Sequence, residues 1–154
     1  MIAIRPADFP EDLPTVRELF GEYAEGLGID LTFQDFQTEM VNLPGKYAPP
    51  KGRVLLAWNA DCPVGCVALR PIDDSRCEMK RLYVRVEMRS LQLGRRLAER
   101  ICDEARSIGY RQICLDTLPT MTSAIRLYTA LGFQPIAPYI YNPVEGAIFL
   151  GRAL

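Results

Sequence analysis

The sequence predicts an α/β fold in which about seven strands form a central sheet and about four helices flank it. Two observations support this prediction. Segments with apolar residues at helical spacing alternate along the chain with short apolar, β-branched runs, and Gly or Pro residues separate most of them. The chain has 154 residues, of which 49% are hydrophobic, enough for one globular domain over residues 1–154 to bury a core.

The first third of the chain predicts one strand and two helices. A short edge strand covers residues 2–5 and stops at Pro6. Apolar residues at helical spacing then predict a helix over residues 8–26. A second, shorter helix is predicted over residues 33–41, with Thr32 as its N-cap.

A hairpin and a third strand are predicted in the middle of the chain. Residues 43–52 contain three prolines and two glycines and are expected to form a surface loop. The apolar runs at residues 54–58 and 64–69 follow, separated by turn residues, and another run covers residues 77–84. We expect these three runs to form antiparallel strands.

The second half of the chain continues this alternation. An amphipathic helix is predicted over residues 93–108, then a short buried strand over residues 111–116. A further amphipathic helix covers residues 119–131 and ends at a glycine. Two last strands are expected at residues 133–141 and 147–150.

Residues 89–96, which follow a predicted strand and open the helix over 93–108, form a turn with three arginines. The first backbone N–H groups of a helix have no partner within it and lie at the positive end of its dipole. Together with Arg89, Arg95 and Arg96, these groups predict a binding site for a phosphate or pyrophosphate.

Besides the order of the elements, three stretches of sequence are informative: residues 78–84, the turn at 89–94, and residues 124–133. In combination they resemble the GNAT superfamily of acyl-CoA-dependent N-acetyltransferases, over nearly the whole chain. The resemblance implies a mixed sheet that splays apart in its middle, with acetyl-CoA bound along the strand that ends at residue 84. The residues that it implies as contacts of acetyl-CoA are Leu82, Tyr83, Val84, Arg89, Ser90, Leu91, Gln92, Leu93, Gly94 and Arg95.

Two positions depart from the family pattern. Gln92 stands where the family's turn has its first glycine. It must either adopt the backbone angles of that glycine or bind the pyrophosphate more weakly. Met121 stands where many relatives have an asparagine, so one hydrogen bond to acetyl-CoA is expected to be missing. Neither change removes the site, because most of the implied contacts come from backbone N–H groups.

Two residues are candidates for the proton transfers of acetyl transfer. By resemblance, Tyr128 protonates the departing CoA thiolate; the alternative is that it only packs on the apolar face of its helix. Glu78 is the candidate base for the acceptor amine, directly or through water; the alternative is an ion pair with Arg76 or Arg81. The backbone N–H of Leu82 would polarise the thioester carbonyl.

Composition excludes several classes of function. Histidine is absent, which excludes Ser-His-Asp and Cys-His mechanisms and the usual zinc sites, and no metal is expected. The five cysteines are odd in number, contain no C-x-x-C pair, and are expected to be reduced.

No signal peptide or membrane-spanning run is apparent, so a cytoplasmic location is expected. Trp58 and Tyr139 are expected to pack in the core and in the last strands, respectively.

Charge is distributed unevenly along the chain. Residues 1–50 contain nine acidic and three basic side chains, a balance of −6, whereas residues 76–111 contain ten basic and five acidic ones, a balance of +5. The acidic part predicts a cationic or amphipathic acceptor, and the alternative is two solvated faces. The acidic side chains concerned are Glu18, Glu22, Glu25, Asp30, Asp35 and Glu39.

These observations predict an acetyl-CoA-dependent N-acetyltransferase that acts on the amine of a small molecule or, less favoured, of a peptide. One alternative is a non-catalytic acyl-CoA-binding or regulatory module, which would release no CoASH. Another is an α/β protein that binds a nucleotide, for which ATP or NAD would compete with CoA. A sequence pI near 5.5 argues against a nucleic-acid partner. No membrane partner is expected, and a homodimer is compatible with the sequence.

Overall fold

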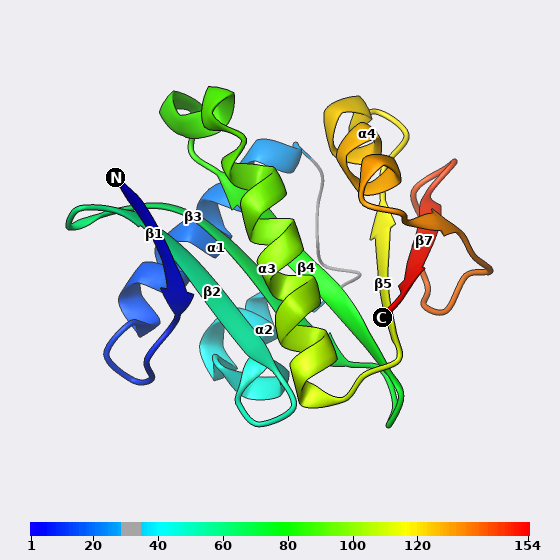
Figure 1. Ribbon diagram of the computed structural model, residues 1–154, viewed down its shortest axis with the longest axis horizontal. Coiled ribbons are helices and arrows are strands. Elements are labelled where there is room, and N and C mark those ends of the chain that lie inside the picture. Colours follow the sequence, from blue (N-terminus) through cyan, green and yellow to red (C-terminus); the bar gives the residue numbers. More distant parts are fainter. Residues whose placement is uncertain (29–34) are drawn as a thin grey trace.

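The computed structural model describes residues 1–28 and 35–154, and its strands form one seven-stranded sheet (Figure 1). The strands lie in the order β1-β2-β3-β4-β5-β7-β6, and all neighbours are antiparallel except β4 and β5, which are parallel. The sheet is therefore mixed, as predicted. The strands are β1 (Ile2–Pro6), β2 (Arg53–Asn59), β3 (Cys62–Pro71), β4 (Arg76–Val84), β5 (Gln112–Thr117), β6 (Gln134–Pro135) and β7 (Ile148–Ala153).

Helices cover both faces of the sheet. In the described part of the chain, α1 (Leu13–Leu27) and α2 (Phe36–Asn42) pack on one face, and α3 (Leu93–Ile108) and α4 (Thr122–Ala130) pack on the other. Two 3₁₀ helices, η2 (Gly45–Tyr47) and η3 (Val86–Leu91), follow α2 and β4. None of the described helices is long and apolar enough to cross a membrane.

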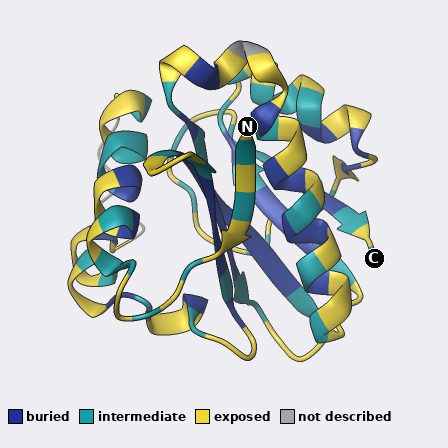
Figure 2. Cartoon of the chain, turned by 60° about the vertical axis from the view of Figure 1, so that its left-hand side comes forward, coloured by how far each residue is buried: buried dark blue, intermediate teal, exposed yellow. Residues whose placement is uncertain are grey.

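The sheet separates two hydrophobic cores. On the α3 side, the apolar residues of that helix pack in one core with β3 and β4: Leu93, Leu97, Ile101 and Ala105 are fully buried, and Ile108 is partly buried. On the α1 side, Phe20 packs against Leu56 of β2 and Tyr47 of η2. Buried residues are concentrated along the strands and on the helix sides that face them (Figure 2).

The centre of the sheet opens between its two parallel strands. β4 and β5 pair only at residues 76–78 and 112–114, and beyond this point they continue unpaired to Val84 and Thr117. The predicted splay in the middle of the sheet is therefore confirmed. It leaves backbone groups along the facing edges of both strands available to another molecule.

A β-bulge in β4 lies at this opening. Residues 66–68 of β3 span residues 80–83 of β4, so β4 holds one extra residue. Arg81 has a φ of 61°, in the left-handed region. In a regular strand Arg81 and Met79 would share a face, but the bulge turns Arg81 toward α2, where its guanidinium lies over the ring of Phe36.

The last third of the chain differs from the sequence prediction. The predicted strand over residues 133–141 is wrong in length, because β6 has only two residues, whereas the strand predicted at 147–150 extends to six residues as β7. Pro135 and Pro138 have no backbone N–H groups to donate to a strand ladder, so an irregular segment follows β6.

The predicted surface loop over residues 43–52 contains a buried residue. Tyr47 is only 1% exposed, and its hydroxyl donates a hydrogen bond to Glu39 over 3.0 Å. The loop is thus tied to the second core instead of lying wholly on the surface. The predicted N-cap Thr32 and the first residue of the predicted second helix, Phe33, lie outside the described residues.

Candidate active site

A groove leads from the surface into the opening between β4 and β5. Its outer part has a volume of about 430 Å³ and lies between the ends of α1 and β4 and the start of α4. Its inner part is a cavity of about 80 Å³ between β4 and β5. Both parts are lined by Tyr23, Leu27, Leu82, Met121 and Ala124, so they are continuous.

The predicted anion-binding turn lies beside the outer groove. Gln92 joins η3 to α3 with a φ of 59° and a ψ of 21°, so it adopts the left-handed conformation in place of the family's glycine. The N–H of Arg96 bonds to the carbonyl of Gln92, which closes the first turn of α3. The N–H groups of residues 93–95 therefore lie at the open end of the helix.

Gly94 leaves space at this helix end. A Cβ added there would lie 3.9 Å from the side chains of Leu127 and Val84, an ordinary contact distance. The packing of the protein itself therefore does not require glycine at this position. The residues of the turn fit a pyrophosphate, since their backbone can be approached closely.

The three arginines of the turn point in different directions. Arg89 lines the outer groove, and its Nε donates a hydrogen bond to the carbonyl of Val84 over 2.9 Å. Arg95 forms an ion pair with Glu99 over 3.0 Å along the exposed side of α3. Arg96 reaches the carbonyl of Ile2 at 3.4 Å. Arg89 is thus the arginine of the turn that the structure brings to the groove.

Four of the ten predicted acetyl-CoA contacts line the outer groove, and the other six continue the chain from it into α3. Leu82, Tyr83, Val84 and Arg89 line the outer part of the groove, Ser90 and Leu91 belong to η3, Gln92 is the junction, and Leu93, Gly94 and Arg95 form the first turn of α3. The structure therefore places the ten residues along one path from β4 to α3. Met121, the second departure from the family pattern, lines the groove as well, and its Sδ accepts a weak hydrogen bond from the Thr117 hydroxyl at 3.8 Å.

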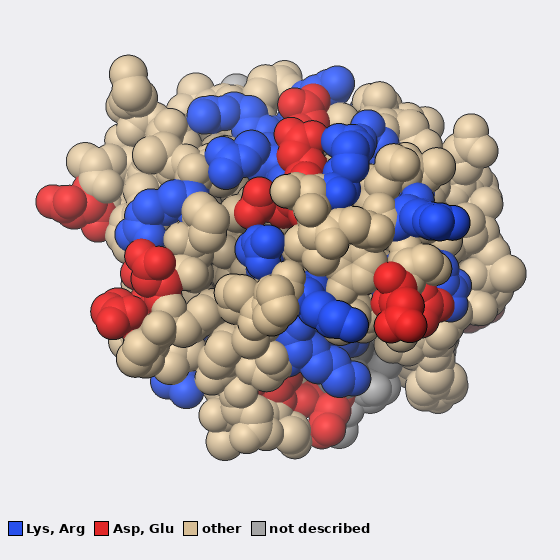
Figure 3. Space-filling model, turned by 60° about the horizontal axis from the view of Figure 1, so that its bottom comes forward, with Lys and Arg blue, Asp and Glu red and all other residues tan. Residues whose placement is uncertain are grey.

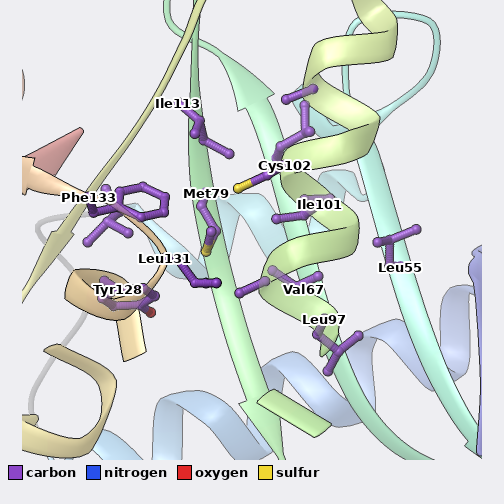
Figure 4. Packing of buried hydrophobic residues seen from close by; sticks show 14 of the residues in the cluster. Leu55, Val67, Met79, Leu97, Ile101, Cys102, Ile113, Tyr128, Leu131 and Phe133 are labelled. Carbon is purple, nitrogen blue, oxygen red and sulfur yellow. The ribbon is translucent and has the colours of Figure 1, made fainter. Parts of the chain in front are cut away.

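Tyr128 of α4 lines the inner cavity. Its ring also packs in the core, with its centroid 5.7 Å from that of Phe133, and it faces β4 near Met79 and Leu131 (Figure 4). The residue therefore combines the packing role with access to the cavity. Burial raises the pKa of the Tyr128 phenol, so it stays protonated at neutral pH and is able to donate a proton.

Glu78 is buried in the paired part of β4. Its Oε1 accepts a hydrogen bond from Arg70 Nε at 3.0 Å, and its Oε2 accepts one from the Tyr139 hydroxyl at 2.6 Å. Among the described residues, the lining of the inner cavity does not include Glu78. Tyr139 packs edge-on against Phe149, as expected of a packing residue, but its hydroxyl also reaches across to β4.

The ion-pair alternative for Glu78 is realised with a different arginine. Arg76 pairs with Asp73 at 2.9 Å and Arg81 with Glu39 at 3.0 Å, so neither holds Glu78. The partner that the structure shows, Arg70, lies in β3 directly opposite Glu78. Strand register decides this pairing, and the sequence alone does not reveal it.

Polar side chains that the sequence prediction did not select also line the inner cavity. They are Lys80 and Arg81 of β4, Asp116 and Thr117 of β5, and Asn142 of the irregular segment. Asp116 and Thr117 are the last two residues of β5. Polar residues at the carboxyl end of a short buried strand are the signal by which sequence reasoning could have found them.

The acidic and basic parts of the chain neutralise each other in the structure. Arg85 at the end of β4 pairs with Glu22 at 2.6 Å and Glu18 at 2.8 Å, both on α1. Glu39 of α2 likewise pairs with Arg81. Positive and negative side chains are intermixed on the face shown in Figure 3. Asp30, another acidic residue of the predicted acceptor surface, lies outside the described residues.

The sequence matches the Acetyltransferase (GNAT) family over residues 13–133. The chain belongs to the GNAT acetyltransferase family. This GNAT protein is an acetyl-CoA-dependent N-acetyltransferase.

Known proteins resemble it over nearly their full length. An uncharacterised N-acetyltransferase from Schizosaccharomyces pombe is 40% identical over 151 residues, which cover 97% of this chain and 93% of that protein. A GNAT acetyltransferase from Staphylococcus aureus superposes with a TM-score of 0.80 at 22% identity over 99% of both chains. A GNAT acetyltransferase from Elizabethkingia anophelis, solved with acetyl-CoA bound, has a TM-score of 0.63 at 20% identity, covering 99% of this chain and 98% of that one. These two structures share the fold.

Proposed function

We propose that this GNAT protein transfers the acetyl group of acetyl-CoA to the amine of a small molecule by direct attack of the amine on the thioester. The observation that carries the proposal is the continuous groove from the turn before α3 to the inner cavity that Tyr128 lines. A water-sized group needs roughly 10–15 Å³ of such volume. The cavity of about 80 Å³ therefore suits an acetyl group and a primary amine nitrogen better than a bulky secondary amine.

The backbone supplies most of the binding in this proposal. The N–H groups of residues 93–95 hold the pyrophosphate at the positive end of α3. The unpaired edge of β4 at Leu82 and Val84 pairs with the extended arm of acetyl-CoA as a strand would. When bound, acetyl-CoA supplies the activated thioester. The N–H of Leu82, next to the bulge, would polarise the carbonyl oxygen on which negative charge develops.

Tyr128 donates the proton that the leaving thiolate needs. A thiol of this kind has a pKa near that of cysteine, about 8.5, so the thiolate is a better leaving group when an acid protonates it. An ordinary phenol, with a pKa near 10, is already protonated at neutral pH, and burial raises the pKa of Tyr128 further, so the group keeps its proton until negative charge develops on sulfur. Its place on the inner cavity brings this donor to the end of the groove.

The acceptor amine must lose a proton before it attacks. An amine with a pKa near 10.4 is neutral in only about one molecule in two thousand at pH 7, so a base accelerates the reaction. The sequence prediction nominates Glu78 for this role, and the lining of the inner cavity adds Asp116. Substitution of each carboxylate in turn distinguishes these two candidates.

Binding and turnover of acetyl-CoA test the proposal. We expect acetyl-CoA at 100 times its Kd to stabilise the fold by about 2.7 kcal/mol, which raises the melting temperature. We also expect CoASH release when a panel of primary amines is added, as measured with a thiol reagent. A melting temperature that millimolar acetyl-CoA leaves unchanged would contradict the proposal.

The variant Tyr128→Phe tests the acid. It removes one oxygen and keeps the ring that packs on Phe133, so the melting temperature and acetyl-CoA affinity should remain near those of the wild type. The rate of CoASH release should fall at least about tenfold, since positioned proton transfer contributes roughly 10²- to 10⁴-fold. Tyr141→Phe is the matched control, because Tyr141 is 72% exposed. Full activity of Tyr128→Phe under chemistry-limited conditions would make Tyr128 a packing residue.

A further inference from the structure

Asp116 and Tyr128 line the inner cavity from two different elements. Asp116 lies near the carboxyl end of β5, where the strand has separated from β4, and its side chain is 7% exposed. Tyr128 lies on α4 above the same cavity. A carboxylate and a phenol that border one small cavity are suitably placed to accept and to donate the two protons of an acetyl transfer.

The two oxygens of Asp116 differ in their partners: one accepts a hydrogen bond, and the other forms only a long ion pair with Lys80. Oδ2 accepts a hydrogen bond from Asn142 Nδ2 at 3.0 Å. Oδ1 lies 4.0 Å from Lys80 Nζ, and in the described part of the chain no hydrogen-bond donor reaches it. The other titratable groups that face Asp116 are the phenols of Tyr128 on α4, Tyr23 on α1 and Tyr139 in the irregular segment after β6.

Glu78, the base nominated by the sequence prediction, has the opposite environment. Arg70 holds Oε1 and Tyr139 holds Oε2, so both oxygens already accept a strong hydrogen bond. Two hydrogen-bond donors thus occupy both oxygens of Glu78, whereas Asp116 accepts one hydrogen bond on Oδ2 and forms only a long ion pair with Lys80 through Oδ1. Glu78 also lies in the paired part of β4, away from the lining of the cavity.

We infer that Asp116, rather than Glu78, is the carboxylate that contacts the acceptor: its Oδ1 binds the ammonium group of a primary amine and takes the proton released when the nitrogen attacks the thioester. This inference rests on the proposed function and adds the acceptor side of its site. Asn142 is a positioning residue that fixes the carboxylate through Oδ2. Glu78 then has a structural role, joining β4 to β3 and to the segment after β6.

The reaction conserves bonds and protons. The ammonium first loses one proton to solvent through Asp116, which gives the neutral amine. The nitrogen then forms a bond to the acetyl carbon, the carbon–sulfur bond breaks, Asp116 takes the second proton from nitrogen, and Tyr128 gives its proton to sulfur. Solvent carries the proton from Asp116 to the phenolate of Tyr128, which restores both groups. The products are the amide, CoASH and one free proton.

The experiment compares two acceptors that differ in their need for a base. Primary alkylamines are protonated at pH 7 and must lose two protons, the first before attack, whereas neutral hydroxylamine loses only the more acidic proton of the nitrogen that has already attacked, which water is able to accept. For Asp116→Asn we expect kcat/KM with alkylamines to fall roughly 10²- to 10⁴-fold and the rate with hydroxylamine to stay within about threefold of the wild type. Glu78→Gln should show no such contrast between the two acceptors. Asp103→Asn, an exposed change on α3, is the control.

The outcomes separate this inference from the proposed function. If the wild type binds acetyl-CoA and releases CoASH, but Asp116→Asn keeps full activity with alkylamines or loses both acceptors equally, the inference is wrong and the proposed function stands. The inference is also wrong if Glu78→Gln shows the selective loss. If acetyl-CoA does not raise the melting temperature of the wild type, the proposed function fails first. If Asp116→Asn folds poorly, Asn142→Ala provides a second test, because it keeps the carboxylate. We expect Asn142→Ala to lower kcat/KM with alkylamines more than the rate with hydroxylamine, but by a smaller factor than Asp116→Asn.

Discussion

Gln92 shows how a single residue can depart from a family pattern without loss of the local geometry. Its backbone adopts the left-handed conformation between η3 and α3, as a glycine would. For a residue with a Cβ this conformation costs roughly 1–2 kcal/mol, whereas glycine adopts it freely. The site is therefore formed in this protein at some expense of stability.

We predict that Gln92→Gly stabilises the protein. Relief of the left-handed strain outweighs the extra backbone entropy of glycine in the unfolded chain, so the free energy of unfolding should rise by about 0.5 to 1 kcal/mol. Urea denaturation measures this change, and acetyl-CoA affinity should stay the same or increase. Leu91→Gly is the control: Leu91 is a 3₁₀-helical residue outside the left-handed region, so glycine there should destabilise. A destabilised Gln92→Gly variant would show that the Gln92 side chain makes a contribution larger than the strain.

At the scale of elements, β3, β4 and α3 approach each other closely at Gly65. A Cβ there would lie 2.9 Å from the backbone oxygen of Tyr83 and 3.2 Å from Leu97 Cδ1. The side chain of Leu97 can move, but the carbonyl of Tyr83 belongs to β4. Any methyl group at this point must therefore displace the end of β4, which carries the predicted acetyl-CoA contacts.

We predict that Gly65→Ala destabilises the protein by roughly 1–3 kcal/mol, the usual cost of overpacking, and weakens acetyl-CoA binding. Thermal unfolding and calorimetric titration measure the two effects. Gly21→Ala is a matched control, because Gly21 lies inside α1 with nothing within 4 Å of an added Cβ. There alanine should stabilise by about 1 kcal/mol through helix propensity. Equal behaviour of the two variants would exclude a close approach at Gly65.

At the scale of the whole molecule, the acidic first part of the chain and the basic middle part hold each other in place. α1 is tied to the end of β4 by Arg85, which bonds Glu18 and Glu22, and by the Tyr83 hydroxyl, which donates to Glu22 at 2.9 Å. Opposite charges that are far apart in the sequence thus meet across the molecule. Because these charges nearly cancel, the net charge of the chain is only −1 and does not indicate their uneven distribution.

The pairing predicts a dependence of stability on pH. The hydrogen bond from Arg85 lowers the pKa of Glu22 from its ordinary value of 4.5 in the folded state. The stability that Glu22 contributes is therefore complete above pH 4.5 and is lost as the pH falls through the lower folded-state pKa. Glu22→Gln should be less stable than the wild type at pH 7, by about 1 kcal/mol or less because the pair is partly exposed.

Urea denaturation of both proteins from pH 7 down to pH 3 measures the effect. The difference between wild type and Glu22→Gln should shrink as the pH falls below 4.5. A difference that stays constant over this range would mean that the carboxylate charge of Glu22 does not stabilise the fold. Glu11→Gln, a change at an exposed residue before α1, is the control.

The sequence by itself determined the order of the elements, the stripe of α3, and the turn at Gln92 with the first helical turn after it. These features depend on residues a few positions apart, so their periodicity and turn chemistry are visible in one stretch of chain. The same local character allowed Tyr128 to be placed on the inner face of its helix. The prolines after β6 show the limit, because apolar content there predicted a longer strand than the backbone can form.

Only the tertiary structure decided the partners of Glu78 and the composition of the inner cavity. Glu78 meets Tyr139 across 61 positions of sequence, and Asp116 meets Asn142 across 26. The bulge at Arg81 and the point at which β4 and β5 separate depend on how strands pair. Such pairings are set by the packing of the whole sheet between two cores, and no local pattern of side chains specifies them.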